Sequence, residues 1–141
     1  MPHRLVAAIL GSLVLAVAGC GGDSAEQKAQ AKVCGARAEI QKSIGSLKDL
    51  SASTVTVDGV RQQLQSIRKD LGTLRNAQGD LNGDRKKAVQ QANSEFASTI
   101  KEVGQTVLRS TSAADAKTQL KNAADQLEST YKSTLSPIDC S

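Results

Sequence analysis

Apolar residues recur at intervals of three and four positions through most of the chain after residue 32, the spacing that gathers side chains on one face of an α-helix. This pattern predicts a first helix from Val33 to about Ser51 and a second that begins at Val57. A third helix is predicted to run through Leu108 and to stop at residues 110–112, and a fourth to end before Pro137, because proline cannot continue the backbone hydrogen-bond ladder. The predicted apolar stripes are, in chain order, Val33, Ala36, Ile40, Ile44, Leu47 and Leu50; Val57, Val60, Leu64, Ile67, Leu71 and Leu74; Val89, Ala92, Phe96, Ile100, Val103, Val107 and Leu108; and Ala116, Leu120, Ala123, Leu127, Tyr131 and Leu135.

Cap residues and glycines mark the ends of these predicted helices. Thr56 is expected to cap the second helix and Ser112 the fourth, because their side-chain oxygens can accept hydrogen bonds from the first free N–H groups. Residues 79–84 combine glycines with Asp and Asn, which predicts a turn. The apolar register also continues through Leu81, so one unbroken helix over residues 57–108 is an alternative.

Helices of about 20 residues joined by short connections imply antiparallel neighbours. The predicted fold class is therefore all-α, an antiparallel up-down-up-down four-helix bundle. Cys34 opens the first helix and Cys140 follows the last. An even number of antiparallel helices brings them to one end, where their Cα atoms can reach the separation of about 4.4–6.8 Å that a disulfide needs. We expect one Cys34–Cys140 disulfide, with two reduced thiols as the alternative.

The first 20 residues differ from the rest of the chain. Arg4 precedes an apolar segment over residues 5–19, which is shorter than the span of about 20 apolar residues that crosses a membrane. The segment leads into Val17-Ala18-Gly19-Cys20, which closely resembles the lipobox of bacterial lipoproteins: an aliphatic residue, two small ones, and the cysteine that becomes the lipidated N-terminus. The resemblance implies a cleaved signal peptide over residues 1–19 and acyl chains such as palmitate on Cys20.

The cysteine count favours this interpretation. Three cysteines in an exported chain leave one odd thiol, and lipidation of Cys20 leaves Cys34 and Cys140 to pair. Cleavage after Ala18 by an ordinary secretory peptidase, or an uncleaved anchor, are the alternatives. Residues 20–32 contain no large apolar side chain and are expected to be the lipidated cysteine and a tether, followed by the helical domain over residues 33–140.

A helix that begins within this tether is also possible from the sequence. Asp23 with Glu26, or Ser24 with Gln27, has the spacing of a capping box, in which a side chain at the cap and one three residues later satisfy each other's backbone N–H groups.

Composition excludes most kinds of catalytic chemistry. The chain has 141 residues, a formal net charge of +4 and one histidine, His3, which lies in the leader. The remainder contains no Ser-His-Asp or Cys-His set, no metal-spaced cysteines and no phosphate-binding glycine loop. Its basic residues are dispersed and stacking aromatics are nearly absent, so nucleic-acid binding is not expected. We expect no enzymatic activity, no catalytic residue, no cofactor and no metal.

Paired carboxylates are the remaining candidates for chemistry. Glu95 with Glu102 and Asp125 with Glu128 each share a helix face. Because charged side chains are seldom buried without a partner, we expect these carboxylates to be solvated.

Arg85, Lys86 and Lys87 follow the turn that should lie at the anchored end of the bundle. We expect this cluster to face anionic lipid headgroups, since basic residues close to a membrane surface are attracted to it. The alternative is a solvated helix start balanced by Asp80 and Asp84.

Gly45, Gly72 and Gly104 lie beside stripe residues in three different predicted helices. Each costs about 1 kcal/mol relative to alanine within a helix. They are either tolerated glycines or the border of a groove for an apolar ligand. A carrier of a lipid or other apolar molecule is therefore the alternative function.

Taken together, these features predict a lipid-anchored protein on the extracytoplasmic face of the cell membrane. Its expected role is a non-enzymatic interaction or structural module of the cell envelope, with membrane lipid as one partner and an envelope protein as the other. In general layout the part after Cys20 resembles small uncharacterised helical lipoproteins of high-GC Gram-positive bacteria, a resemblance that transfers no functional residue.

Overall fold

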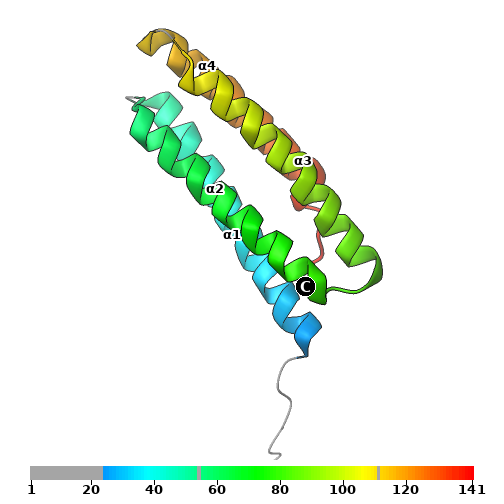
Figure 1. The fold of residues 1–141 in the computed structure, drawn as a ribbon. Coiled ribbons are helices and arrows are strands. Elements are labelled where there is room, and N and C mark those ends of the chain that lie inside the picture. The colour runs from blue at the N-terminus through cyan, green and yellow to red at the C-terminus, as the bar shows by residue number, and fades with distance from the viewer. Residues whose placement is uncertain (1–23, 54, 111) are drawn as a thin grey trace, which may run out of the picture.

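Helices make up most of the chain in the computed structural model, which describes residues 24–53, 55–110 and 112–141. These residues form four α-helices and no strand (Figure 1): α1 (Ala25–Ala52), α2 (Val57–Ala77), α3 (Gly83–Leu108) and α4 (Ala113–Thr130). A short 3-10 helix, Gln78–Asp80, follows α2, and a π-helical turn, Tyr131–Leu135, follows α4. The predicted leader, Cys20 and Asp23 lie outside the described residues.

The start of α1 corrects the predicted tether. The helix begins at Ala25 rather than Val33, and Ser24 is its N-cap. The Ser24 side chain accepts a hydrogen bond from the Gln27 backbone N–H at 3.2 Å, and the Gln27 side chain accepts one from the Ser24 N–H at 2.8 Å. This capping box supplies local stability, and Ala29 is buried one turn later, so the weakly apolar segment is part of the helix.

Backbone geometry between α2 and α3 confirms the predicted turn and contradicts the single long helix. Leu81 is extended, with φ −84° and ψ 147°, and Gly83 has φ 43°. Glycine adopts this left-handed region without the steric cost that a Cβ atom brings. Leu81 is only 4% exposed, so the turn also contributes an apolar side chain to the core.

The predicted caps of the later helices are present. The Thr56 side chain accepts from the Gly59 N–H at 3.1 Å, and the Ser112 side chain accepts from the Asp115 N–H at 3.1 Å. Because each cap satisfies a backbone donor that the helix itself cannot, α2 and α4 begin where the sequence indicates.

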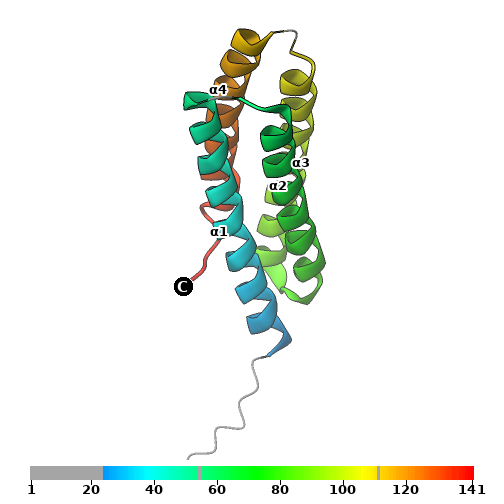
Figure 2. The same ribbon diagram turned by 90° about the vertical axis from the view of Figure 1, so that its left-hand side faces the viewer.

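The helices lie side by side around one apolar core. α1 and α3 each pack along both α2 and α4, and Figure 2 shows the connections between consecutive helices at alternating ends of the molecule. Most of the predicted stripe residues are buried in this core, including Phe96, which is fully enclosed. Leu50 and Ala116 are only partly buried, and Val57 and Leu108 remain 57% and 41% exposed. Val57 and Leu108 occupy the first turn of α2 and the last turn of α3.

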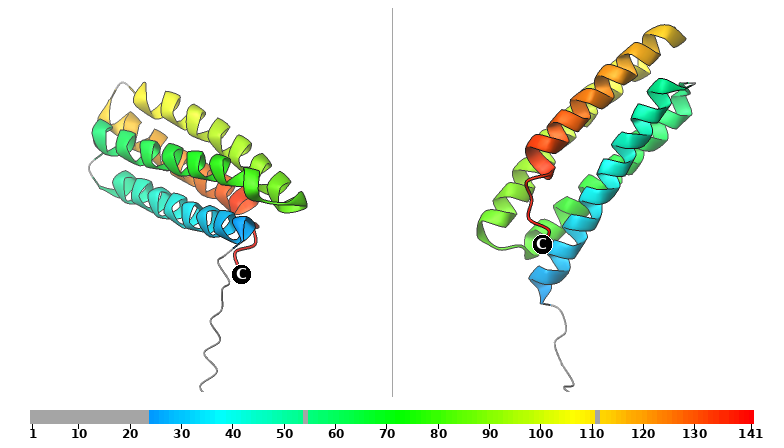
Figure 3. Two further views of the ribbon diagram at one scale, coloured as in Figure 1. Left: turned by 60° about the horizontal axis from the view of Figure 1, so that its bottom comes forward. Right: turned by 180° about the vertical axis from the view of Figure 1, so that it is seen from behind.

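A wide turn ends α4 and redirects the chain. The Ser136 N–H donates to the Tyr131 carbonyl at 2.9 Å, a bond that spans five residues instead of four. The segment after Pro137 then crosses to the side of α1 (Figure 3), and Ile138 is buried on the way. Residues 136–141, here called the C-terminal strap, therefore belong to the folded body.

Candidate functional site at the disulfide-closed end

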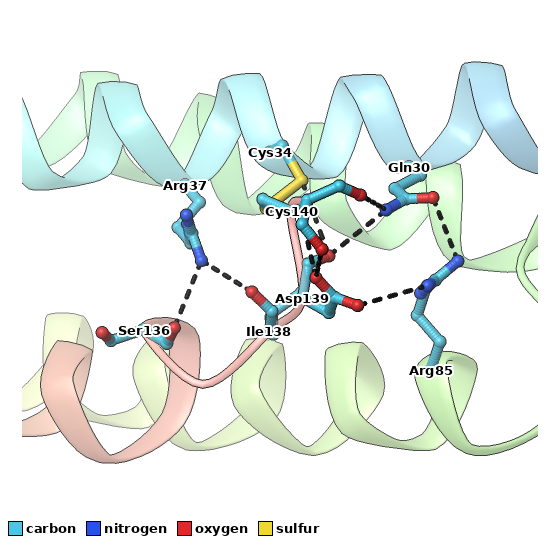
Figure 4. The surroundings of a disulfide bond; sticks show 9 residues. Gln30, Cys34, Arg37, Arg85, Ser136, Ile138, Asp139 and Cys140 are labelled. Atoms are coloured by element: carbon cyan, nitrogen blue, oxygen red, sulfur yellow. Dashed lines mark hydrogen bonds and ion pairs between the residues drawn. A yellow bond between two sulfur atoms is a disulfide. The ribbon is translucent and has the colours of Figure 1, made fainter.

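The Cys34–Cys140 disulfide joins α1 to the C-terminal strap (Figure 4). The two Cα atoms lie 5.7 Å apart, although 106 positions separate the cysteines in sequence. Such a separation requires the start of α1 and the end of the chain to lie at the same end of the molecule. The predicted pairing is thereby confirmed.

Side chains of α1 hold the strap on both sides of the disulfide. The Arg37 guanidinium donates to the carbonyl oxygens of Ser136 at 3.2 Å and Ile138 at 2.6 Å. The Gln30 amide, one turn before Cys34, donates to the carbonyl of Asp139 at 3.4 Å. These bonds satisfy backbone acceptors that lie beyond the last helix, so the strap has polar partners as well as a covalent one.

Arg85 ties the start of α3 to both α1 and the strap. Its guanidinium donates to Gln30 Oε1 at 3.1 Å, lies 3.4 Å from Glu26 Oε1 and lies 4.0 Å from Asp139 Oδ2. Its side chain is 29% exposed. Lys86 and Lys87 are exposed. Within the predicted basic cluster, the charge of Arg85 is thus shared with two carboxylates, and the two lysines face solvent.

Local hydrogen bonds lower the pKa of the Asp139 carboxyl below its usual range. The largest contribution is the hydrogen bond from the Ser141 hydroxyl, followed by that from the Ser141 N–H, with Arg85 adding a favourable charge. Hydrogen bonds and a nearby cation both favour the ionised form. Protonation of Asp139 at acid pH would therefore weaken these contacts of the strap.

A groove of about 290 Å³ lies between α1 and the end of α4, and Tyr131 and Gly45 are among its lining residues. The Tyr131 hydroxyl donates to Gln41 Oε1 at 3.3 Å, and burial raises the pKa of the tyrosine. Glu128, on the same groove, is paired with Lys48 and Lys132. Tyr131 is thus held protonated as a donor, and the carboxylate is already neutralised by its neighbours.

The remaining candidates for chemistry do not come together. Glu95 and Glu102 are both exposed, and the Gln91 amide donates to Glu95 at 2.9 Å. Asp125 is exposed, whereas Glu128 lies in the groove above. Across the residues that the structure describes, no group of His, Cys, Asp and Glu side chains is arranged to hold a metal ion.

The interior glycines lie on separate surfaces. Gly45 lines the groove between α1 and α4, whereas Gly72 lines a groove between α2 and α3. A Cβ atom built on either glycine meets nothing within 4 Å, so neither is required for close helix contact. Gly104 is buried, and a Cβ there would lie 3.4 Å from Arg68 and 3.7 Å from Leu64, both on α2.

The opposite end of the molecule carries a feature that the sequence interpretation missed. Val57 and Leu108 are the large hydrophobic side chains that stay exposed within the described ranges. Val57 begins α2 and Leu108 ends α3, and both helix ends lie away from the disulfide (Figure 1). Their helical spacing assigned them to the core. Their position at helix ends was the available signal, because the terminal turn of a helix can project beyond its neighbours. We call Val57 and Leu108 the distal apolar pair.

Comparison with known proteins gives no relative for this arrangement: no family model, no curated protein and no solved structure matches the chain. Among the helices of the described residues, none is both long enough and apolar enough to cross a membrane.

Proposed function

We propose that the chain is a lipoprotein anchored through Cys20 to the extracytoplasmic face of a bacterial cell membrane, where it is a non-enzymatic interaction module of the envelope. The observation that carries this proposal is the position of the distal apolar pair. A partner that covers these two side chains would remove their apolar surface from water, and the predicted lipid site precedes the helix that starts at the other end.

The proposed topology is an up-down-up-down bundle. Contacts between α1 and the last part of the chain support it, since Gln30 contacts Asp139, Gln41 contacts Tyr131, and Lys48 contacts Glu128. The residue numbers of the partners, from 139 to 128, fall as the residue numbers on α1 rise from 30 to 48, which is the order expected of antiparallel helices.

The early start of α1 sets how far the bundle can stand from the bilayer. From Cys20 to Ala25 the chain can span at most about 18 Å, because an extended residue advances about 3.6 Å. α3 contains 26 residues, and a helix of that length measures about 39 Å. An upright bundle would thus present the distal apolar pair roughly 40 Å beyond its anchored end.

Fractionation tests the anchor. Wild-type protein should remain with washed membranes, whereas Cys20→Ser should release the folded protein into the soluble fraction or leave an uncleaved precursor of higher mass. Lys28→Ser, a surface change on α1, is the matched control and should stay on membranes. Retention of processed Cys20→Ser on membranes would contradict the lipid anchor.

The partner is proposed to be an envelope protein that covers the distal apolar pair. A photo-crosslinking amino acid at Val57 or Leu108 should give one discrete adduct in native membranes, and the same probe at exposed Gln65, midway along α2, should not. Replacing both Val57 and Leu108 by serine should abolish the non-covalent complex between this protein and the partner that was found in the crosslinked adduct. Identical adducts from all three positions would contradict a distal interface.

Membrane contact through the basic cluster is proposed to rest on Lys86 and Lys87. Non-lipidated protein should bind phosphatidylglycerol vesicles weakly, at about 1 kcal/mol per lysine near the surface. Replacement of both lysines by alanine should lower that binding, whereas the same change at exposed Lys117 and Lys121 should not. Equal binding by all three proteins would exclude this role.

A further inference from the structure

A cationic groove runs between α2 and α3, the two helices that lie side by side in Figure 2. Its volume is about 250 Å³, and Arg68, Arg75 and Lys101 line it. Arg68 and Arg75 are seven positions apart on α2, two turns along one helix face, and Lys101 reaches it from α3. Positive charge from both helices thus converges on one groove.

Among the described residues, no carboxylate lines this groove, whereas carboxylates line the two grooves beside α1. The groove between α1 and α2 contains Glu39 and Asp70 beside its lysines, and the one between α1 and α4 contains Glu128. Within the part of the chain that the structure describes, the ion pairs do not include any of the three cations of the α2–α3 groove. Three unneutralised cations repel one another, so an anion bound among them gains favourable interactions that the free protein lacks.

Small residues make the groove accessible and position one of its cations. Gly72 forms part of the lining, with no atom within 4 Å of the place where its Cβ would be. Gly104 on α3 lets the Arg68 guanidinium extend across the helix pair, with Nη2 3.4 Å from the position of the missing Cβ. Leu71 and Ile100 are buried beneath the charges, and Ala97, which is exposed, supplies apolar surface within the groove.

Asn93 adds a requirement beyond charge. It lines the same groove, and its buried Oδ1 atom has no hydrogen-bond partner among the described residues. A buried acceptor without a partner is unfavourable, and a ligand that donates a hydrogen bond to it removes that cost. Phosphate supplies mainly acceptor oxygens, whereas a hydroxyl group supplies a donor.

We propose that the α2–α3 groove binds a phosphorylated polyol, with Arg68, Arg75 and Lys101 on the phosphate and Asn93 accepting from a hydroxyl group. Guanidinium groups suit phosphate because they can donate two parallel hydrogen bonds to its oxygens. The exposed Ala97 side chain supplies apolar surface for the C–H face of a sugar or polyol. The ligand is either a free sugar phosphate or the headgroup of a phospholipid, which share this chemistry.

Titration of the non-lipidated mature chain tests the proposal, because the described helices and their core lie within residues 24–141. In a ¹H–¹⁵N NMR titration at about 50 mM salt, glucose 6-phosphate should bind with a Kd of about 1 mM or tighter, inorganic phosphate several-fold more weakly, and glucose not detectably. Shifts should centre on Gly72 and the Asn93 side-chain amide. Absence of binding by glucose 6-phosphate would overturn the site, and equal binding by phosphate would overturn the polyol assignment.

Charge variants locate the site. Replacing Arg68, Arg75 and Lys101 together by glutamine should weaken glucose 6-phosphate binding at least about tenfold, since each removes a charge-assisted hydrogen bond. The thermal midpoint of the variant should be unchanged or higher, because like charges are removed. Glutamine at exposed Arg109, Lys117 and Lys121 makes the same change in net charge and should leave binding intact. Equal weakening by both triple variants would show only a net-charge effect and overturn the groove.

Two uncharged changes complete the test. Gly72→Leu fills the groove without altering charge and should weaken binding, whereas Gly45→Leu makes the same substitution between α1 and α4 and should not. Asn93→Ala should abolish the preference for glucose 6-phosphate over phosphate. A folded Gly72→Leu protein, with a wild-type circular dichroism spectrum, that binds as tightly as the wild type would refute the location.

Vesicles distinguish the two ligand sources. Flotation with phosphatidylinositol vesicles that is lost in Gly72→Leu assigns a lipid headgroup. Binding of glucose 6-phosphate in solution, with flotation equal in wild type and Gly72→Leu, assigns a free ligand. If Gly72→Leu retains both glucose 6-phosphate binding and vesicle flotation, the groove is not the binding site.

Discussion

Reduction or removal of the Cys34–Cys140 disulfide is the perturbation with the largest expected effect on stability. The bond closes a loop of 106 positions. In the chain-entropy model, closing a loop of this length restricts the unfolded chain by about 5 kcal/mol at 25 °C. A domain of this size has a total stability of about 5–15 kcal/mol. The disulfide therefore accounts for a third or more of the expected free energy of unfolding.

Urea denaturation, followed by circular dichroism at 222 nm, measures this contribution. The non-lipidated mature chain should be compared with its Cys34→Ser/Cys140→Ser variant. We expect the variant to lose about 4–5 kcal/mol. We also expect a steeper dependence of the unfolding free energy on urea, because the uncrosslinked unfolded chain exposes more surface.

Substitution of the strap contacts separates the covalent effect from local packing. Arg37→Gln in the oxidised protein removes the bonds to the Ser136 and Ile138 carbonyls, and we expect a smaller loss of about 1–3 kcal/mol. If the double-serine variant loses less than about 1 kcal/mol while the strap stays attached, restriction of the unfolded chain is not what the bond contributes.

Phe96→Ala should destabilise the protein by about 3–5 kcal/mol, because it removes the largest of the fully buried side chains, and urea denaturation measures the loss. Gly45→Ala should raise the free energy of unfolding by up to about 1 kcal/mol, since a Cβ there meets nothing within 4 Å, whereas Gly83→Ala should lower it by about 1–2 kcal/mol because φ is 43°. Asp139 has a folded-state pKa below the ordinary value of 3.8. The ionised carboxylate therefore contributes to the free energy of unfolding above pH 3.8, and this contribution is lost as the pH falls through the folded-state pKa. Wild type should therefore lose more stability than Asp139→Asn between about pH 5 and about pH 2, and an identical pH profile would show that the Ser141 hydrogen bonds do not persist in solution.

The local signals in the sequence were sufficient for most helix boundaries. Thr56 and Ser112 cap the helices that they were expected to cap, because a side-chain oxygen next to a periodic apolar run has a local physical effect. The turn before α3 was predictable for the same reason, since Gly83 adopts a backbone conformation that favours glycine.

Tertiary contacts explain what the sequence did not predict. The Ser24–Gln27 spacing left open a helix that begins in the tether, and the burial of Ala29 is the contact that the sequence did not reveal. Ile138 is buried in an irregular segment, where helical spacing gives no signal. Leu81 keeps the apolar register, but it is buried in an extended turn and not in the continuous helix that the register allowed. The convergence of Arg68 and Lys101 on one groove depends on how α2 and α3 are rotated about their axes, which charge positions along the sequence do not reveal.

The mass of the N-terminal peptide from membrane-extracted protein tests the central claim, the lipid anchor, most directly. We predict a peptide that begins at Cys20 and carries a diacylglyceryl group, with or without a further acyl chain. An unmodified Cys20, or a peptide that begins before it, would contradict the claim.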